Sequence, residues 1–279
     1  VIALDAKMVN ASHGASNNKR SIFGMVNAYA TKAGISLAQM RTDYEKKDEK
    51  QGFRDLIDLL YLKGTIVTID AGGCHANIAN KIIDKEGDYF LALKRNQKSL
   101  LIQIQNLLKR EDYEKDFFQE EQSKSHGRIE KRTCVAVNLS DHILQSLEKK
   151  CHQRKTPMWK GLRSACKITA QRTLNGEQSI QERYYLFSRE ADAKKMSELA
   201  RGHWGIENRL HWVLDMAFDE DHCRTRRGYG GENFAVLRQI ALNLLKSEKT
   251  SKRSIKGKRL KSGWDDNYLK KVIISQKNF

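Results

Sequence analysis

Three acids far apart in the sequence have the types and settings that metal chemistry requires. Asp5 and Asp70 each follow an apolar run, "VIAL" and "TIVTI", that is rich in strand-forming residues. The carboxyl ends of strands in an open α/β sheet form the edge where ligands bind. Two aspartates at that edge would repel each other unless a cation lay between them, and their oxygens suit Mg²⁺ or Mn²⁺. A pair of such ions can activate water and stabilise the leaving oxygen in phosphodiester cleavage.

The third acid of this hypothesis is Glu207, in the stretch "HWGIENRLHWVLD". It borders an apolar stripe with helical spacing, so its carboxylate can face inward without complete desolvation. The stripe consists of Ile206, Leu210, Val213 and Ala217. The residues alone leave other acids open for the same role, namely Asp215, Asp219 and Asp221.

Each of these acids also has an ordinary interpretation. Asp70 begins "DAGG", which suits a turn or helix cap, Asp5 fits a solvated strand end, and Glu207 fits an exposed helix position. A zinc site is a further alternative, because His203, Glu207 and His211 follow one another at helical spacing. The pairs Cys151-His152 and His222-Cys223 lack partners at ligand spacing.

The pattern of strands and helices around these acids predicts a mixed α/β fold. A strand, a hairpin turning at 32–34, a helix, a strand, a helix, a strand and a helix follow one another up to Arg110. Alternating segments from 120 to 190 indicate a β-rich insertion with Pro157 in a linker. We expect a catalytic core in residues 1–119, completed by helices in 191–245. Residues 246–279 carry 11 Lys or Arg against 3 Asp or Glu, which predicts a basic tail that is mobile until it binds a partner.

Composition favours a polyanionic partner. The 279 residues include 51 Lys or Arg and 34 Asp or Glu, a formal net charge of +17, and such a surplus is typical of nucleic-acid-binding proteins. No apolar run is long enough to span a membrane. Five scattered cysteines without a C-x-x-C pair indicate a reducing cytosol, where we expect a DNA-acting protein to associate with the nucleoid.

Several motifs resemble those of the insertion-sequence DDE transposases, most closely the H-repeat-associated proteins. They are "IALDAK", "VTIDAGGCH", "YFLALKRNQ", "HGRIEKR", "ARGHWGIENRLHWVLDMAFDED", "NFAVLRQIALNLLK" and "KGKRLKSGWDDNYL". The resemblance implies a ribonuclease H-like mixed sheet flanked by helices, with a β-rich insertion before the last catalytic helix. It also implies that the metal-binding catalytic acids are Asp5, Asp70 and Glu207, in preference to the later aspartates.

By resemblance, the reaction is cleavage at transposon ends followed by strand transfer into target DNA, with Mg²⁺ or Mn²⁺, expected as two ions. The partners would be double-stranded DNA and further copies of the chain. Cations, amides and indoles near the acids are candidate DNA contacts: Lys94, Asn96, Gln97, His126, Arg128, Arg201, His203, Trp204, Asn208, His211 and Trp212. Core packing is the alternative for the two tryptophans, and a solvated turn for the groups at 94–97 and 126–128.

The family also carries an N-terminal accessory domain ahead of its first acid. Since this sequence starts at Val1, we expect the segment to keep the fold and the acids but to recognise transposon ends poorly. Two other functions stay open: a non-catalytic relic that only binds DNA, and another ribonuclease H-like nuclease that cuts DNA without joining it.

Overall fold

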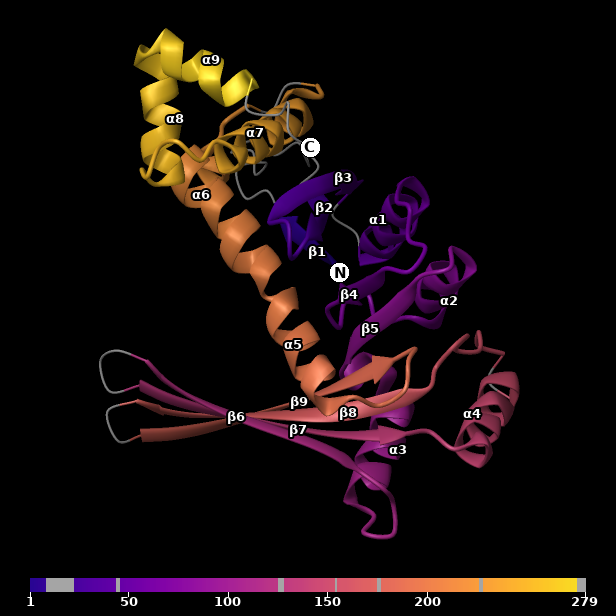
Figure 1. The fold of residues 1–279 in the computed structure, drawn as a ribbon. Coiled ribbons are helices and arrows are strands. Elements are labelled where there is room, and N and C mark those ends of the chain that lie inside the picture. Colours follow the sequence, from indigo (N-terminus) through magenta and orange to yellow (C-terminus); the bar gives the residue numbers. More distant parts are fainter. Residues whose placement is uncertain are drawn as a thin grey trace. The chain divides into compact units, whose positions relative to one another are not determined.

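A computed structural model describes residues 1–8, 23–43, 46–124, 128–153, 155–174, 177–225 and 228–274. The chain divides into two compact units (Figure 1). The hairpin unit comprises Ile2–Leu60 and Trp204–Phe279, and the long-sheet unit comprises Tyr61–His203 with Val1. This division groups the first strands with the last helices, and the domain boundaries at 119/120 and 190/191 stay a prediction.

The hairpin unit is built on three antiparallel strands in the order β1, β2, β3. They span β1 (Ile2–Met8), β2 (Phe23–Ala30) and β3 (Ile35–Asp43). The predicted hairpin turn is confirmed: Gly34 has a φ of 74°, a conformation that glycine adopts without strain, and its N–H donates to the Ala30 carbonyl at 2.7 Å. As in any extended strand, alternate residues of β1, β2 and β3 point to opposite faces of the sheet.

Helices cover both faces of the hairpin unit's sheet. Helix α1 (Lys46–Leu59) packs on one face, where Gly52 approaches Thr42 and Val26. On the other face, Phe23 and Met25 pack against Ala235 of helix α7 (Gly230–Ser247). The same face carries Ala3 and Tyr29, which pack against residues of the segment 206–214 and of α7.

The first part of the helical region expected in residues 191–245 is divided into several elements. Helix α5 (Ala193–His203) ends at the border of the units. A π-helical turn, η3 (Glu207–His211), and helix α6 (Trp212–Phe218) follow in the hairpin unit. A short 3-10 turn, η4 (Glu220–His222), then leads toward α7.

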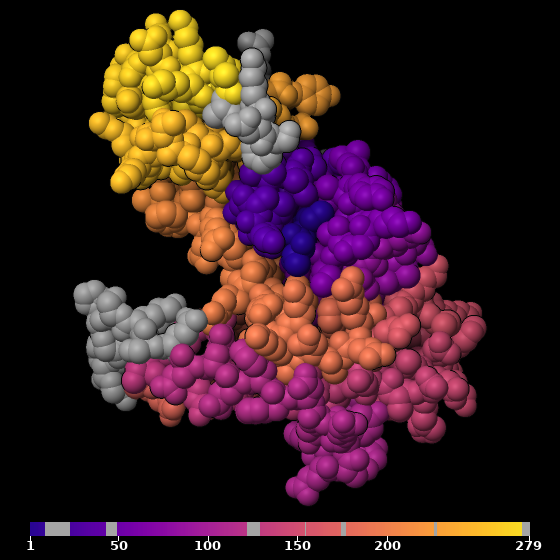
Figure 2. All heavy atoms as spheres, viewed as in Figure 1, coloured from indigo at the N-terminus to yellow at the C-terminus, as the bar shows by residue number. Residues whose placement is uncertain are grey.

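The basic C-terminal segment, expected to be mobile, forms two helices. They are α8 (Ile255–Trp264) and α9 (Asp266–Ile274), and Figure 2 shows them within one compact yellow body. Leu245 of α7 packs there against Tyr268 and Val272. The hydrophobic contact explains the difference, because net charge alone cannot reveal a few apolar residues that dock a helix.

The long-sheet unit contains a mixed sheet in the order β4, β5, β9, β8, β7, β6. Strands β4 (Ile66–Ile69) and β5 (Asp88–Leu93) are parallel, with helix α2 (Ala76–Asp84) connecting them. The others pair antiparallel: β6 (Asp116–Lys124), β7 (Arg128–Asn138), β8 (Ser164–Leu174) and β9 (Glu177–Phe187). Since β9 pairs with β5, the predicted β-rich insertion extends the sheet of this unit.

Helices flank this sheet as well. Helix α5 buries Met196 and Leu199 against one face, beside Phe90 and Tyr185, whose rings stack at 4.6 Å. Helix α3 (Lys98–Lys109), preceded by the 3-10 turn η2 (Arg95–Gln97), lies on the other face in Figure 1. Helix α4 (Asp141–Gln153) was not predicted. The fold is thus mixed α/β with strands flanked by helices, as expected for a ribonuclease H-like protein.

Candidate metal centre

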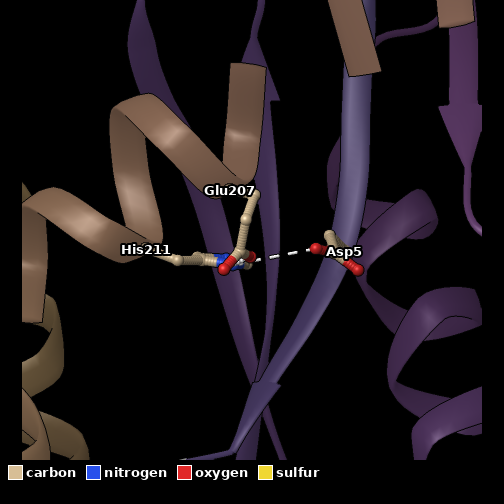
Figure 3. Close-up of side chains that lie close together, drawn as sticks. All are labelled: Asp5, Glu207 and His211. Atoms are coloured by element: carbon tan, nitrogen blue, oxygen red, sulfur yellow. Dashed lines mark hydrogen bonds and ion pairs between the residues drawn. The ribbon is translucent and has the colours of Figure 1, made fainter. Parts of the chain in front are cut away.

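Two of the three predicted acids meet in the hairpin unit, together with a histidine. Asp5, Glu207 and His211 each offer one ligand atom, and these atoms lie within 4.8 Å of one another. Nδ1 of His211 lies 3.0 Å from Oε2 of Glu207 and 3.7 Å from Oδ2 of Asp5. Figure 3 shows the Glu207 and His211 side chains directed toward Asp5. Residues more than 200 positions apart in the sequence thus form one acidic cluster.

Asp5 lies in the middle of β1, whereas the sequence suggested a strand end. Burial along β1 falls after Leu4, so the strand continues to Met8 while its side chains become accessible. One oxygen of Asp5, Oδ1, accepts the N–H of Ala6 at 3.0 Å. The apolar run before Asp5 therefore marks the point where burial along the strand decreases, and not the end of the strand.

A π-helical turn carries the other two members of the cluster. The N–H of Trp212 donates to the carbonyl of Glu207, five residues earlier. Such turns insert one residue into a helix and occur frequently at functional sites. Leu210 stays buried in the core while Glu207 is half-exposed. The turn therefore holds an accessible carboxylate beside the nearly inaccessible His211.

The environment keeps Glu207 ionised. The hydrogen bond with His211 lowers the pKa of Glu207, and Lys7 acts in the same direction, whereas partial burial opposes both. Two carboxylates and a half-exposed position suit a hard divalent cation with oxygen ligands. The donor set of Asp5 and Glu207 therefore fits Mg²⁺ or Mn²⁺.

Asp70 belongs to the long-sheet unit, directly after β4. Its Oδ1 accepts the N–H of Gly72 at 2.9 Å, so the turn-cap interpretation of "DAGG" is correct for one oxygen. The loop after it is held by two side-chain amides: Asn96 donates to the Ala71 carbonyl at 2.7 Å, and Gln97 donates to the Cys74 carbonyl at 3.1 Å. Convergence of Asp70 with the acids of the hairpin unit stays a prediction.

The later acids that competed with Glu207 have other partners. Lys7 forms ion pairs with Asp215, with Glu220 at 2.9 Å and with Asp221 at 3.4 Å. Asp219 pairs with His222 at 2.7 Å. Burial alone would lower the pKa of Lys7, but the acids reverse this effect and raise it. These contacts favour Glu207 over the aspartates as the third acid.

The zinc alternatives gain no support among the described residues. His203 is not part of the cluster, and its Nδ1 lies 3.1 Å from Oγ1 of Thr68 in the long-sheet unit. Within the part of the chain that the structure describes, the Cys151-His152 and His222-Cys223 pairs contribute to no such group.

The residues predicted to contact DNA lie in different settings. Lys94, Trp204, Asn208 and Trp212 are exposed, so core packing is not the role of either tryptophan. Arg201 is exposed but pairs with Glu120. His126 lies outside the described residues, as does the side chain of Arg128. His211 differs from the prediction, since it is 2% exposed and hydrogen-bonded inside the unit, which favours an internal role over DNA contact.

The sequence reasoning missed the polar residues around His211. Asn27 is 1% exposed and places Nδ2 3.3 Å from Nε2 of His211, and Gln239 donates to Asn27. The available signal was polarity at an apolar position: Asn27 interrupts "FGMVNAYA", and Gln239 lies in "VLRQIALNLL". A buried amide in such a run requires hydrogen-bond partners.

Comparison with known proteins gives the family. Residues 1–244 match the family described as Transposase DDE domain. Two Escherichia coli K12 proteins, "Putative protein YbfL" and "H repeat-associated putative transposase YhhI", are each 34% identical over 280 residues, 98% of this chain and 71% of either relative. "Putative transposase YncI" of Escherichia coli O157:H7 is 35% identical over 283 residues, 99% of this chain and 69% of that protein. The chain belongs to the DDE transposase family, as the resemblance indicated.

A helix that spans a membrane must be both long and apolar. Among the described residues, no helix combines the length and the apolar composition that a span requires.

Proposed function

We propose that the chain is a transposase that cleaves DNA at transposon ends with a divalent metal ion and transfers the freed strand to target DNA. The observation that carries the proposal is the convergence of Asp5 and Glu207, whose ligand atoms lie within 4.8 Å. Family membership supplies the reaction class, and the acids supply the place where it would occur.

The residues of the chain would hold and orient the reacting groups. Asp5 and Glu207 would hold Mg²⁺ or Mn²⁺ in the hairpin unit, and Asp70 would join them from the long-sheet unit. Such a cation supplies charge for the phosphate oxygens and lowers the barrier to activating water or a 3′-hydroxyl. Because His211 keeps Glu207 ionised, the carboxylate is ready to bind a cation near neutral pH.

The proposed partner is double-stranded DNA. A formal charge of +17 favours a polyanion, and the exposed indoles of Trp204 and Trp212 lie on the segment that carries Glu207. Aromatic rings at such positions can stack on unpaired bases. We therefore propose that this segment contacts the DNA end, and that several copies of the chain assemble on it.

The direct test is a cleavage assay on a supercoiled plasmid that carries the DNA flanking the coding sequence. We expect nicking that requires Mg²⁺ or Mn²⁺, and a loss of at least about 10³-fold in Glu207→Gln, which removes the charge without changing the shape. Glu198→Gln, an exposed change on α5, is the matched control and should cut normally.

The products separate the three candidate functions. Joining of the cut strand to a second DNA supports the transposase, and cutting without joining would indicate another nuclease of the same fold. Binding without any metal-dependent cleavage by the unsubstituted chain would contradict the proposal and indicate a relic.

A further inference from the structure

A chain of polar side chains leads from Glu207 into the interior of the hairpin unit. Nδ1 of His211 is 3.0 Å from Oε2 of Glu207, and Nε2 of the same ring is 3.3 Å from Nδ2 of Asn27. Nε2 of Gln239 donates to Oδ1 of Asn27 at 2.5 Å, and Oγ of Ser36 donates to Oε1 of Gln239 at 2.5 Å. We call this set, Glu207, His211, Asn27, Gln239 and Ser36, the amide–imidazole chain.

Its four inner members are buried among apolar side chains. Their exposed fractions are 2% for His211, 1% for Asn27, 7% for Gln239 and 8% for Ser36. A polar group in such surroundings destabilises the folded chain if it loses its hydrogen bond, because it no longer has water as an alternative partner. Reversal of any one amide would break bonds on both of its sides, so the members hold one another in a single arrangement.

The arrangement fixes which nitrogen of His211 carries its proton. Oδ1 of Asn27 accepts from Gln239, and Nδ2 also donates to the Met25 carbonyl at 3.1 Å, so the amide turns its NH₂ group toward the ring. Nε2 of His211 must then accept, and a neutral ring carries its hydrogen on Nδ1. Each hydrogen bond between members of the amide–imidazole chain thus has its donor directed toward the Glu207 end.

Three backbone features bring these groups together. The strand register pairs Asp5 directly with Asn27, so both side chains lie on the face that carries the acidic cluster. A register shift at Ala28/Tyr29 sets Ser36 opposite Tyr29, which turns Ser36 to the same face, where it reaches Gln239. The π-helical turn supplies Glu207 and His211.

We propose that Asn27 and Gln239 are positioning residues, which hold His211 in its Nδ1–H form so that it donates to Oε2 of Glu207 and aims the other oxygen, Oε1, at the cation. His211 itself would not be a ligand, because both of its nitrogens are engaged. This inference rests on the proposed function in one respect, the presence of a cation between the acids. The tautomer of His211 can be measured without any metal.

The competing explanation is that these amides only pack α7 against β2. A matched pair of substitutions separates the two explanations. Asn27→Asp replaces the NH₂ donor by an oxygen that must accept from Nε2. Asn243→Asp makes the same chemical change one helical turn from Gln239. Among the described residues, the Asn243 amide bonds only the backbone of Ser36: Oδ1 accepts its N–H at 3.0 Å, and Nδ2 donates to its carbonyl at 2.7 Å.

The first measurement is the ¹⁵N spectrum of the imidazole rings in the metal-free full chain, with His211 assigned from its absence in His211→Gln. We expect Nδ1 protonated and Nε2 unprotonated in the unsubstituted chain and in Asn243→Asp. In Asn27→Asp we expect a protonated Nε2. Gln239→Glu should also move the His211 proton to Nε2, because Asn27 then turns its NH₂ group toward the new carboxylate and its oxygen toward the ring. This variant provides the test if Asn27→Asp fails to fold.

The second measurement is Mn²⁺ affinity by calorimetric titration. Loss of a group that orients a metal ligand typically weakens binding about 10-fold to 100-fold. We expect that loss in Asn27→Asp and Gln239→Glu, and less than a 3-fold change in Asn243→Asp. An unsubstituted ring with Nε2 protonated would overturn the inference, as would equal Mn²⁺ affinity in all four proteins. Absence of Mn²⁺ binding by the unsubstituted chain would contradict the proposed function instead, and the ring spectrum alone would then decide the inference.

Discussion

Lys7 shows how a single residue can hold several acids together near the candidate centre. Its Nζ lies among Asp215, Glu220 and Asp221, and Glu220 is only 4% exposed. Arg238, at 3.8 Å, is a second cation near Glu220. Removing the lysine would leave mutually repelling carboxylates in a largely buried position, which costs more than an exposed ion pair contributes.

We therefore predict that Lys7→Met destabilises the chain by about 2–3 kcal/mol at neutral pH. Urea unfolding measures the loss. The double variant Lys7→Met/Glu220→Gln should recover more than half of it, because the buried carboxylate is no longer charged. A loss below about 0.5 kcal/mol in the single variant would show that the acids do not depend on Lys7.

At this scale, residue type and spacing revealed the acids but not their partners. Asp5 and Glu207 were recognisable because each borders an apolar pattern in the sequence. Lys7, Asn27 and Gln239 were not, because their roles arise from strand register and from packing between segments more than 200 residues apart. The location of Asp70 after a buried strand was predicted, whereas the amides of Asn96 and Gln97 that hold its loop were predicted to contact DNA.

At the scale of elements, Glu248 ties the C-terminal helices to α7. Its carboxylate accepts from Thr250 and Ser251 backbone N–H groups at 2.6 and 3.1 Å and from the Tyr268 hydroxyl at 2.7 Å. It also pairs with Lys258 at 3.2 Å. Burial would raise the pKa of Glu248, but these bonds outweigh it and lower the pKa to about 2.

The lowered pKa predicts a pH-dependent contribution to stability. Since the folded pKa of about 2 lies below the unfolded value of 4.5, the contribution is complete above pH 4.5 and is lost as pH falls toward 2. Its size is about 3 kcal/mol. We expect Glu248→Gln to unfold at lower urea at pH 7, and we expect the difference from the unsubstituted chain to shrink to less than about 1 kcal/mol near pH 2.5. A difference independent of pH would contradict this; Glu177→Gln, an exposed change, is the control.

Close approach of α1 to the hairpin allows a second test at this scale. A Cβ at Gly52 would lie 2.2 Å from Cγ2 of Thr42 and 3.1 Å from Cγ2 of Val26. We predict that Gly52→Ala costs about 1–3 kcal/mol of unfolding free energy. Thr42→Ser removes the nearer methyl, so the double variant should be more stable than Gly52→Ala alone. If Gly52→Ala is as stable as the unsubstituted chain, α1 does not pack this closely.

Most elements could be predicted because their apolar periodicity is local. The strands before Asp5 and Asp70 and the turn at Gly34 are examples. Helix α4 was missed because its apolar positions are few and interrupted, and Leu147 is its one buried residue. The interruption of the helix before Glu207 could not be predicted from the sequence. A π-helical turn changes the backbone hydrogen bonds but keeps nearly the same spacing of apolar residues as an α-helix.

At the scale of the whole molecule, net charge should govern DNA affinity. If the chain makes six or more phosphate contacts, its affinity for DNA should fall by about 10³-fold or more as the salt concentration rises from 50 to 200 mM. We predict that Lys94→Ala lowers the slope of log affinity against log salt by about 1.

Trp212→Ala should instead weaken binding by about 1–3 kcal/mol at every salt concentration, because stacking is not ionic. Fluorescence anisotropy measures both, and an unchanged slope and affinity would remove these residues from the interface.

We propose that Asp5, Asp70 and Glu207 together hold one metal centre. Iron(II) in place of magnesium, with added hydrogen peroxide as oxidant and ascorbate to re-reduce the iron, generates hydroxyl radicals that cut the polypeptide near the bound ion, and the fragments identify the segments around it. We expect cuts near residues 5, 70 and 207 together, suppressed by Mg²⁺ and by Glu207→Gln. Cuts near residues 5 and 207 without any near residue 70, or no localised cuts, would contradict the proposal that the three acids share one metal centre.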